Sequence, residues 1–205
     1  MAAPIASRFD FPKDEKKYPW LSMLLDAYHI LDIANEIGIN EESEKRGQEV
    51  ACGESCYHCC LRPVVPIIGI ELAGISWFSC EQLTGKVRLK VKGRLLAHKE
   101  TTSCPFLIEK ICSIYPVRPL ACRSFHVFGE KYNKEEDPWE TRRKDVWSHG
   151  KETALKISMT ILPFWNITDR EKQKAAYESG FIMNEAINMH EYKWAQIQTS
   201  MLQFD

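Results

Sequence analysis

The stretch that decides the fold is Cys52-Gly-Glu-Ser-Cys56-Tyr-His-Cys59-Cys60, which places four of the chain's eight cysteines within nine residues. Three more cysteines follow, at Cys104, Cys112 and Cys122. A local group of thiols that is completed by distant thiols is typical of a metal that fixes a loop, because each thiolate supplies one ligand. The spacing therefore predicts a metal site built from these seven cysteines.

Clustered cysteines have two common explanations, disulfide bonds and metal ligation, and the cellular compartment separates them. The first ten residues contain no apolar signal core, and no apolar run in the sequence approaches the length that crosses a bilayer. We therefore expect a cytoplasmic protein with reduced cysteines and no membrane partner. Metal binding then explains the cluster better than disulfide formation does.

Composition limits the size of the core and the kind of partner. The chain has 205 residues, of which 44% are hydrophobic, and this is enough for one domain spanning 1–205 whose core does not depend on thiols alone. The 27 Lys and Arg residues are balanced by 28 Asp and Glu residues, which argues against a nucleic-acid partner. The basic run from Lys86 to Lys99 is interpreted as the solvated face of a helix.

Apolar periodicity predicts mostly helices. A first amphipathic helix starts at Pro19 and stops at Gly38, and a second covers 70–83 and ends at Gly85. Further expected elements are a helix over the basic run, a short hairpin around Glu109-Lys110 and a rigid connector that carries Cys112 and Cys122. The C-terminal helices are expected to start at the capping box Thr168-Asp169-Arg170-Glu171 and to be interrupted near Gly180. The predicted class is mainly α, with a small β-hairpin and irregular loops. We expect a single compact domain organised around a cysteine-rich metal site, in which residues 52–128 form the cysteine-cluster core between helical N- and C-terminal flanks.

The number of thiols exceeds the needs of one ion, since four thiolates saturate a zinc ion or a 4Fe-4S cluster. Either two metals are present, or one metal or cluster is bound and some cysteines serve elsewhere. Cys59 and Cys60 would point to opposite sides of an extended backbone, so that one of them faces away from the first metal. Cys80 stands apart from the other cysteines and is interpreted as a small buried hydrophobic residue.

Other polar residues near the cysteines have less specific patterns. His58 and His126 could add nitrogen ligands, but hydrogen-bonded or surface histidines are the simpler interpretation. Arg118 and Arg123 lie beside the late cysteines and are interpreted as cofactor-binding residues that donate to thiolate sulfur and offset its charge, with ordinary ion-pairing arginines as the alternative. No catalytic residue is assigned. The aromatic residues expected to shield the site from water are Phe106, Tyr115 and Phe125.

The motifs together resemble the YkgJ-type cysteine-cluster family, whose domains are described as zinc- or iron-chelating and which includes flagellin lysine-N-methylase. The motifs that carry the resemblance are Cys52-x3-Cys56-x2-Cys59-Cys60, Cys104-Pro105-Phe106-Leu107, Cys112-Ser113-Ile114-Tyr115, Arg118-Pro119 and Cys122-Arg123-Ser124-Phe125. The resemblance covers about 52–128. Family members often have two residues between the first two cysteines, where this chain has three, so that the participation of Cys52 is less secure than that of Cys56.

Three functions are compatible with these features. The first is a metal-binding protein whose zinc or iron-sulfur site is structural or carries electrons. The second, implied by the resemblance and by the Cys-x3-Cys-x2-Cys spacing of radical enzymes, is an iron-sulfur, S-adenosylmethionine-dependent protein lysine N-methylase-like enzyme acting on a protein substrate. The flanking sequence, however, lacks the alternation of strands and helices that such enzymes normally show. The third is a thiol redox protein, which the absence of an isolated Cys-x-x-Cys pair disfavours.

Overall fold

The computed structural model describes residues 7–51, 56–98, 103–132 and 136–204. The fold divides into two compact units, each made of three segments. Unit 1 comprises Met1–Cys52, Arg123–Lys131 and Asp137–Glu185, and unit 2 comprises Gly53–Cys122, Tyr132–Glu136 and Ala186–Asp205. Helices predominate in both units, and the named strands form two small antiparallel sheets, so the predicted mainly α class is confirmed. The domain limits 1–205 and 52–128 stay predictions.

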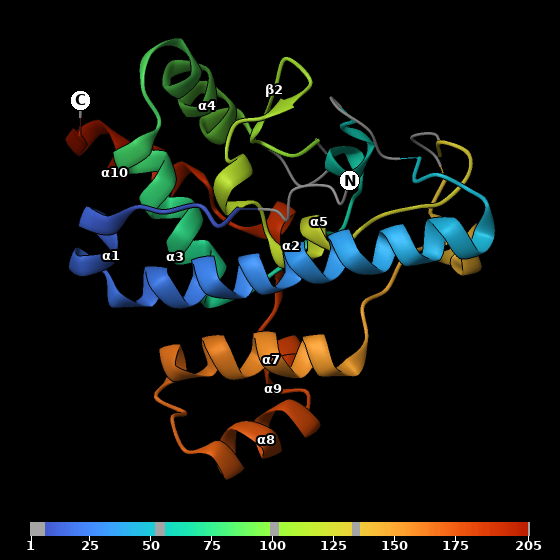
Figure 1. The fold of residues 1–205 in the computed structure, drawn as a ribbon. Coiled ribbons are helices and arrows are strands. Elements are labelled where there is room, and N and C mark those ends of the chain that lie inside the picture. The colour runs from blue at the N-terminus through green and yellow to red at the C-terminus, as the bar shows by residue number, and fades with distance from the viewer. Residues whose placement is uncertain (1–6, 52–55, 99–102, 133–135, 205) are drawn as a thin grey trace. The chain divides into compact units, whose positions relative to one another are not determined.

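Unit 1 is built on the long helix α2 (Pro19–Arg46), which packs against α7 (Lys151–Ile161) (Figure 1). The helix starts at Pro19 as predicted, because proline is compatible with the first helical turn. Its buried apolar face is formed mainly by Leu21, Leu24, Leu25, Tyr28 and Leu31. The other helices of this unit are α1 (Pro12–Lys17), α6 (Pro138–Thr141), η4 (Arg143–Asp145), η5 (Leu162–Trp165), α8 (Arg170–Glu178) and α9 (Phe181–Asn184). None of the described helices of the chain is both long enough and apolar enough to span a bilayer.

The prediction that the first helix stops at Gly38 is wrong. The helix continues to Arg46 and ends at Gly47, whose φ of +63° lies in the left-handed region that glycine adopts easily. Gly38 instead lies against the indole of Trp147, and a Cβ atom at this position would come within 2.4 Å of Trp147 Cη2. Trp147 Nε1 donates to Asn35 Oδ1 at 3.1 Å, which holds the indole on the helix. Gly38 therefore permits a close contact between distant segments.

Unit 2 contains the cysteine blocks on short elements joined by turns. Its named elements are η1 (His58–Leu61), β1 (Pro66–Ile67), α3 (Gly69–Trp77), the π-helix η2 (Phe78–Gln82), α4 (Gly85–Ala97), β2 (Leu107–Ile108), β3 (Ile111–Cys112), η3 (Tyr115–Val117), β4 (Ile187–Asn188), η6 (Met189–Glu191), α10 (Ala195–Met201) and η7 (Leu202–Phe204). The short helix α5 (Leu120–Arg123) ends at the first residue of the second segment of unit 1. The helix predicted over 70–83 is observed as α3 followed by η2, and the helix predicted over the basic run is observed as α4.

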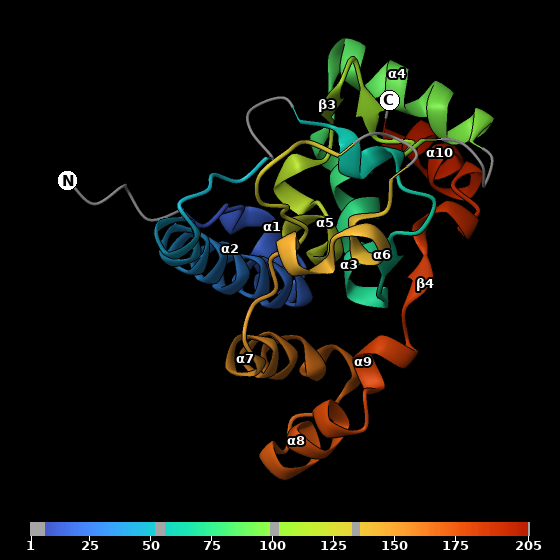
Figure 2. The same cartoon turned by 90° about the vertical axis from the view of Figure 1, so that its right-hand side faces the viewer.

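The last segment of the chain closes unit 2 by pairing with its first part. Strand β4 pairs antiparallel with β1, with Ile67 opposite Ile187, and α10 packs against α4 (Figure 2). The core of the unit includes Trp194, whose ring meets Phe106 edge to face at a centroid distance of 4.9 Å. Trp194 Nε1 donates to the carbonyl of Met189 at 2.7 Å, so that the buried indole keeps a hydrogen bond.

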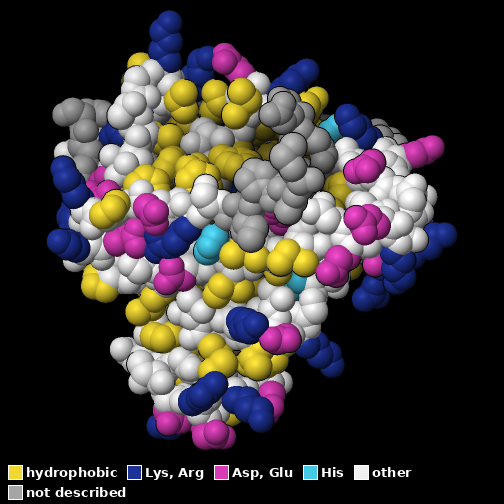
Figure 3. Space-filling model, in the orientation of Figure 1, with side chains coloured by type: hydrophobic (Ala, Val, Ile, Leu, Met, Phe, Trp, Pro, Cys, Tyr) yellow, Lys and Arg dark blue, Asp and Glu magenta, His cyan; other side chains and the backbone are white. Residues whose placement is uncertain are grey.

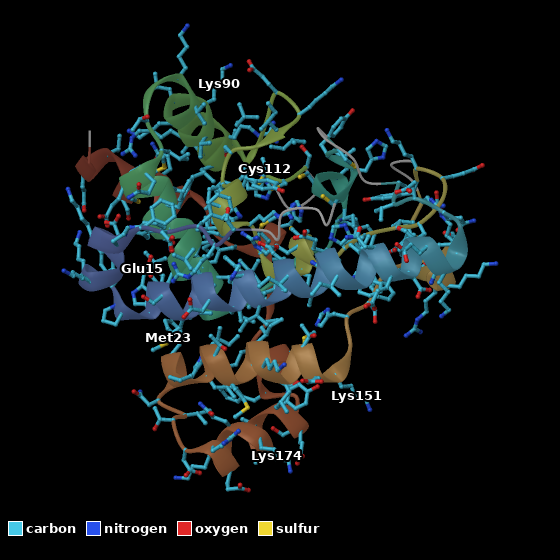
Figure 4. All side chains as sticks on the ribbon, viewed as in Figure 1. Glu15, Met23, Lys90, Cys112, Lys151 and Lys174 are labelled. Atoms are coloured by element: carbon cyan, nitrogen blue, oxygen red, sulfur yellow. The ribbon has the colours of Figure 1, made fainter. Side chains whose placement is uncertain are left out.

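The interpretation of the basic run as a solvated helix face is wrong for two of its residues. Arg88 and Lys92 are each only 8% exposed. The Arg88 guanidinium donates to the carbonyls of Ser79 at 3.0 Å, Cys80 at 2.8 Å and Leu83 at 3.3 Å, and to the carbonyl of Met201 at 2.5 Å. The carbonyls at the end of a helix have no partner within the helix, and here a buried cation supplies their donors. Lys90, on the outer side of α4 in Figure 4, does follow the prediction and pairs with Glu109.

The predicted hairpin is confirmed. Strands β2 and β3 pair antiparallel with Leu107 opposite Cys112, and Glu109 and Lys110 form the two-residue turn. Both turn residues have positive φ, 52° and 67°, which is the requirement of a type I′ turn. Figure 3 shows hydrophobic side chains gathered in the upper part of the view. Exposed apolar residues of these elements include Leu89 on α4, which is 67% exposed, and Ile111 on β3, which is 65% exposed.

The C-terminal helices begin one residue later than the capping box predicted. Asp169, and not Thr168, is the N-cap of α8, and its side chain accepts a hydrogen bond from the backbone N–H of Lys172 at 3.0 Å. The predicted interruption near Gly180 is confirmed, because this glycine has a φ of +72° and separates α8 from α9.

Candidate metal centre

Six cysteines of unit 2 line one pocket, whose volume is about 420 Å³. They come from three separated blocks of sequence and from elements of different kinds. The first block runs from Cys52 to Cys60, the second contains Cys104, and the third runs from Cys112 to Cys122. Cys56 precedes η1, Cys59 and Cys60 lie on η1, Cys104 precedes the hairpin, Cys112 lies on β3, and Cys122 lies on α5. Figure 4 labels Cys112 on the inner part of the hairpin strand. The fold therefore brings together cysteines that are up to 66 residues apart in the chain.

Backbone and side-chain hydrogen bonds hold the three blocks in place around the pocket. The N–H of Cys104 donates to the carbonyl of Cys60 at 2.8 Å, which joins the first block to the second. The buried carboxylate of Glu71 accepts from the N–H of Ile68 at 3.0 Å and from the N–H of Leu120 at 2.5 Å. Glu71 thus ties the start of α3 to the start of α5, and α5 carries Cys122.

The prediction that Cys59 and Cys60 point to opposite sides is wrong. It assumed an extended backbone, whereas both residues lie on the 3₁₀-helix η1 and both contribute to the wall of the pocket. The two thiols are hydrogen-bonded to each other, and the thiol of Cys60 is also hydrogen-bonded to that of Cys104. One helical turn therefore presents two adjacent thiols to the same space. The expectation that Cys112 and Cys122 lie on a rigid connector without regular structure is also corrected, because Cys112 lies on β3 and Cys122 lies on α5.

The remaining wall of the pocket is mostly apolar and aromatic, with two cations. It is formed by Tyr57, Val65, Lys110, Ile111, Ile114, Tyr115, Arg118, Pro119 and Met189. The Lys110 ammonium lies 5.5 Å from the centroid of the Tyr57 ring, and the Arg118 guanidinium lies 4.3 Å from that of Tyr115. Of the three aromatic residues expected to shield the site, Tyr115 lines the pocket. Phe106 instead packs on Trp194, and Phe125 lies near Trp139 in unit 1.

Three of the thiols, those of Cys59, Cys60 and Cys122, have raised pKa values and so favour the protonated form. The pKa of Cys59 is raised first by its hydrogen bond with Cys60 and then by burial, and the pKa of Cys60 is raised first by its hydrogen bond with Cys104. Burial raises the pKa of Cys122, and the nearby thiols Cys59, Cys60 and Cys112 raise it further.

A positive charge acts in the opposite direction on this group. The guanidinium of Arg118 lowers the pKa of Cys59 and Cys122, although less than burial and the neighbouring thiols raise them. A metal cation in the pocket would act on the thiols as Arg118 does, with a larger charge and at shorter range.

The structure places Arg123 elsewhere than the sequence analysis expected. Arg123 belongs to unit 1 and is 1% exposed, and its guanidinium pairs with Asp32 at 2.5 Å and lies 4.2 Å from the Tyr28 ring centroid. Its carbonyl accepts hydrogen bonds from Asn35 Nδ2 at 2.9 Å and is 2.8 Å from His126 Nε2. These contacts hold Arg123 against α2 within unit 1, and Arg123 lies outside the lining of the pocket.

The other candidates outside the cysteine blocks also have structural surroundings. Cys80 is buried on η2, as predicted for a small hydrophobic residue, and burial raises its pKa. His58 Nδ1 lies 2.6 Å from the carbonyl of Tyr132, and His126 is hydrogen-bonded as described, which agrees with the simpler interpretation of both histidines. Cys52 lies outside the described residues.

The donor set fits a thiophilic metal, although its present arrangement is not a finished coordination sphere. All seven described cysteines are free thiols. Within the described ranges, no three side chains of His, Cys, Asp or Glu are positioned to hold a metal ion as they stand. Thiolates nevertheless suit zinc, copper(I) and iron, and rotation about χ1 moves each sulfur between staggered positions.

The residues that sequence reasoning missed are those without a cysteine motif around them. Glu71 is a single carboxylate in an apolar helix. Its role as a tie between α3 and α5 is visible only in the structure, where it is 2% exposed and accepts hydrogen bonds from both elements. Lys110 enters the pocket wall because it occupies the turn of the hairpin. Met189 comes from the last segment of the chain, which no sequence motif connects to the cysteines.

Comparisons with known proteins single out the part of the chain that forms this pocket. Residues 51–143 match a family model named CxxCxxCC and described as "Putative zinc- or iron-chelating domain". The match includes all seven cysteines of the three blocks. No curated protein and no solved structure matches the chain.

Proposed function

We propose that this protein binds zinc or iron through cysteine thiolates in the pocket of unit 2, because residues 51–143 match the family model described as a zinc- or iron-chelating domain. The observation that carries the proposal is the convergence of six cysteines from three blocks on one pocket. Thiols scattered over the surface of a protein would not share a cavity of about 420 Å³. The proposed ligands are Cys56, Cys59, Cys60, Cys104, Cys112 and Cys122, to which the sequence analysis adds Cys52.

The surrounding residues support this role by electrostatics and by the exclusion of water. Each thiolate adds a negative charge, and Arg118 lies where it stabilises the deprotonated forms of Cys59 and Cys122. Ile114, Val65 and Met189 form an apolar wall that limits access of water. When bound, the metal would cross-link the three blocks, and an iron-sulfur centre would in addition carry electrons.

A cytoplasmic location, as predicted, would keep the thiols reduced and available to the metal. The metal itself is identified by anaerobic purification followed by element analysis, labile sulfide determination and visible absorption. Zinc without visible absorption indicates a mononuclear or polynuclear zinc site, whereas iron with labile sulfide and broad absorption indicates an iron-sulfur cluster. Purified protein that binds neither metal after anaerobic loading would contradict the proposal.

Matched cysteine variants test where the metal binds. Cys122→Ala removes a thiol that lines the pocket, and Cys80→Ala removes a thiol that is buried on η2 away from it. We expect Cys122→Ala to lose much of the bound metal, because the open coordination position is poorly filled by water in an apolar pocket. Cys80→Ala should retain the metal content of the original protein. An equal loss in Cys80→Ala would show that Cys80 is functional as well and that the ligands are not confined to the pocket, whereas full retention of metal in Cys122→Ala would contradict binding in the pocket.

A second candidate function is an S-adenosylmethionine-dependent, iron-sulfur enzyme with a protein lysine as its substrate. The observation that favours it is the size of the pocket, since the sphere within a metal–sulfur distance of 2.3 Å has a volume of only about 50 Å³. A pocket of about 420 Å³ therefore has room for more than one four-coordinate ion. Against it, the described strands pair only antiparallel, unlike the parallel sheet of a β/α barrel. Equilibrium binding of S-adenosylmethionine to the anaerobically reconstituted protein tests this candidate, and absence of binding rejects it.

A further inference from the structure

The pocket contains more thiols than one metal centre uses, and their arrangement indicates how the surplus is employed. A zinc ion or a 4Fe-4S cluster is saturated by four thiolates. The described lining contains six cysteines. With one centre of either kind, two thiols in the wall of the pocket would have no ligand role. The inference that follows rests on the proposed function and concerns the number of metal ions.

Cys60 has the position of a bridging ligand. Its thiol is hydrogen-bonded to the thiol of Cys59 on one side and to that of Cys104 on the other. It is also close enough to Cys112 and Cys122 for their charges to interact. Cys60 thus interacts with thiols of both other blocks, and the N–H of Cys104 donates to its carbonyl at 2.8 Å, whereas a terminal ligand needs to approach only one ion.

The 3₁₀-helix η1 explains why this arrangement is possible. Cys59 and Cys60 are consecutive in the chain, and both line the pocket from the same helical turn. Their thiols therefore reach the pocket from adjacent positions, so that Cys59 could bind one of the two ions that a bridging Cys60 would join.

We propose that the pocket holds two metal ions in a single cluster of six cysteine thiolates, with Cys60 as one of two bridging ligands. Two four-coordinate ions have eight coordination positions, and six thiolates fill all of them when two of the six bind both ions. No thiol of the described lining is then left without a metal. The pocket, at about 420 Å³, has room for the second ion.

The charges of the lining match this content. Loading two divalent ions releases six protons from six thiols, and the cluster then carries a net charge of 2−. Apart from the cysteines, the charged side chains in the described lining are Lys110 and Arg118, both positive. Together they offset the cluster charge without an acidic residue in the wall.

Native mass spectrometry of the zinc-loaded full chain, combined with zinc analysis per mole of protein, tests the inference. We expect a dominant species with two zinc ions per chain. Cys60→Ala should lower zinc well below one ion per chain, because it removes a ligand from both ions. Cys104→Ala removes a ligand assigned to one side of Cys60 and should retain about one ion. Cys80→Ala, the control outside the pocket, should retain two.

Other outcomes separate the inference from the function on which it rests. The two-ion cluster would be overturned if the original protein bound one zinc ion per chain and if Cys60→Ala and Cys104→Ala kept that ion. The proposed metal-binding function would then remain intact. Four irons with labile sulfide would also overturn the two-ion cluster, in favour of one iron-sulfur cluster. Absence of any metal would overturn both. Circular dichroism of each variant checks folding, and if Cys60→Ala is unfolded, Cys60→Ser under the same analysis replaces it.

Discussion

At the scale of single residues, Gly38 of α2 is tightly packed and Gly93 of α4 has open space around it. We therefore expect alanine to change the stability of the protein in opposite directions at these two positions. A Cβ at Gly38 would lie 2.4 Å from Trp147 Cη2, whereas a Cβ at Gly93 of α4 has nothing within 4 Å. Alanine at Gly93 should stabilise by about 0.5–1 kcal/mol, since alanine favours helix over glycine. Alanine at Gly38 gains the same propensity but displaces the indole, and we expect a net loss of about 1–3 kcal/mol.

Urea unfolding followed by far-ultraviolet circular dichroism measures both effects. The Gly38→Ala midpoint should fall and the Gly93→Ala midpoint should rise. The idea of a close contact fails if both variants are stabilised alike. The same pair shows a limit of sequence reasoning. The local sequence predicts a helix stop at Gly38. It gives no sign of the contact that explains this glycine, because Trp147 is more than a hundred positions away.

Glu15 gives a prediction for the dependence of stability on pH. Its carboxylate accepts hydrogen bonds from Arg8, from the N–H of Phe11 and from Ser22 Oγ, and the Arg8 bond is the main reason that its pKa is lowered to about 2. A carboxylate whose pKa is lowered by folding stabilises the protein above the pKa of the unfolded chain, about 4.5. This contribution is lost as pH falls from about 4.5 towards 2.

Glu15→Gln isolates this contribution from those of other carboxylates. At pH 7 the variant should be less stable than the original protein, and the difference in the free energy of unfolding should shrink as pH falls through this range. Unfolding curves at pH 7, 4 and 3 provide the measurement. A difference that is constant with pH would mean that the ionised carboxylate does not contribute.

At the scale of elements, α4 depends on a buried cation. Arg88 supplies donors to the carbonyls of Ser79, Cys80 and Leu83 at the end of η2, and to that of Met201 at the end of α10. Replacement by methionine keeps much of the volume but leaves buried carbonyls without these donors. We expect Arg88→Met to cost about 3 kcal/mol, as for loss of several hydrogen bonds to a charged group.

The control for this variant is Lys86→Met on the same helix, where the side chain is exposed. It should change the free energy of unfolding by no more than about 0.5 kcal/mol. Chemical unfolding at pH 7 distinguishes the two variants. Similar small effects for both would indicate that the carbonyls find other donors.

The elements themselves show which sequence signals are sufficient. The start of α2 at Pro19 and the hairpin around Glu109-Lys110 were predictable, because proline at a first turn and apolar residues flanking a short turn are local patterns. The burial of Arg88 was not predictable. A basic residue in a charged run is normally solvated, and the carbonyls that it binds belong partly to α10, at the other end of the chain.

At the scale of the whole molecule, the residues that line the pocket of the proposed metal site all belong to unit 2. We therefore expect removal of the metal by a chelator to loosen this unit more than unit 1. The metal would join blocks that the unfolded chain does not hold together, so that its binding energy becomes folding energy of this unit. The paired helices α2 and α7 of unit 1 have an apolar interface of their own. Metal removal should therefore loosen residues 56–122 more than α2 and α7.

Hydrogen exchange with mass spectrometry, before and after anaerobic chelation, measures this difference. Amides near η1, the hairpin and α5 should exchange at least several-fold faster after chelation, and those of α2 and α7 should change little. The control is Cys80→Ala treated in the same way, which should respond as the original protein does. Equal acceleration in both units would show that the metal supports the entire fold.

The site was predictable as a set of residues but not as a geometry. The cysteine blocks and their spacing are local features, and they were sufficient to name the six cysteines that line the pocket. The direction in which the side chains of Cys59 and Cys60 point was not predictable, because it depends on whether the backbone is extended or helical. The division between Arg118, in the pocket wall, and Arg123, held by Asp32 of α2, depends on contacts formed only in the folded chain.

The adjacency of Cys59 and Cys60 also has a consequence for damage by oxidants. Consecutive Cα atoms are about 3.8 Å apart across a trans peptide, whereas residues joined by a disulfide usually have Cα atoms about 4.4–6.8 Å apart. The two neighbours are therefore poor partners for each other. When a peroxide oxidises one of them to a sulfenic acid and is itself reduced, the thiol of Cys104, whose N–H donates to the Cys60 carbonyl, is placed to attack that sulfur and displace water. The first cross-link formed under oxidative stress would then join the first and second cysteine blocks, closing a loop of more than forty residues.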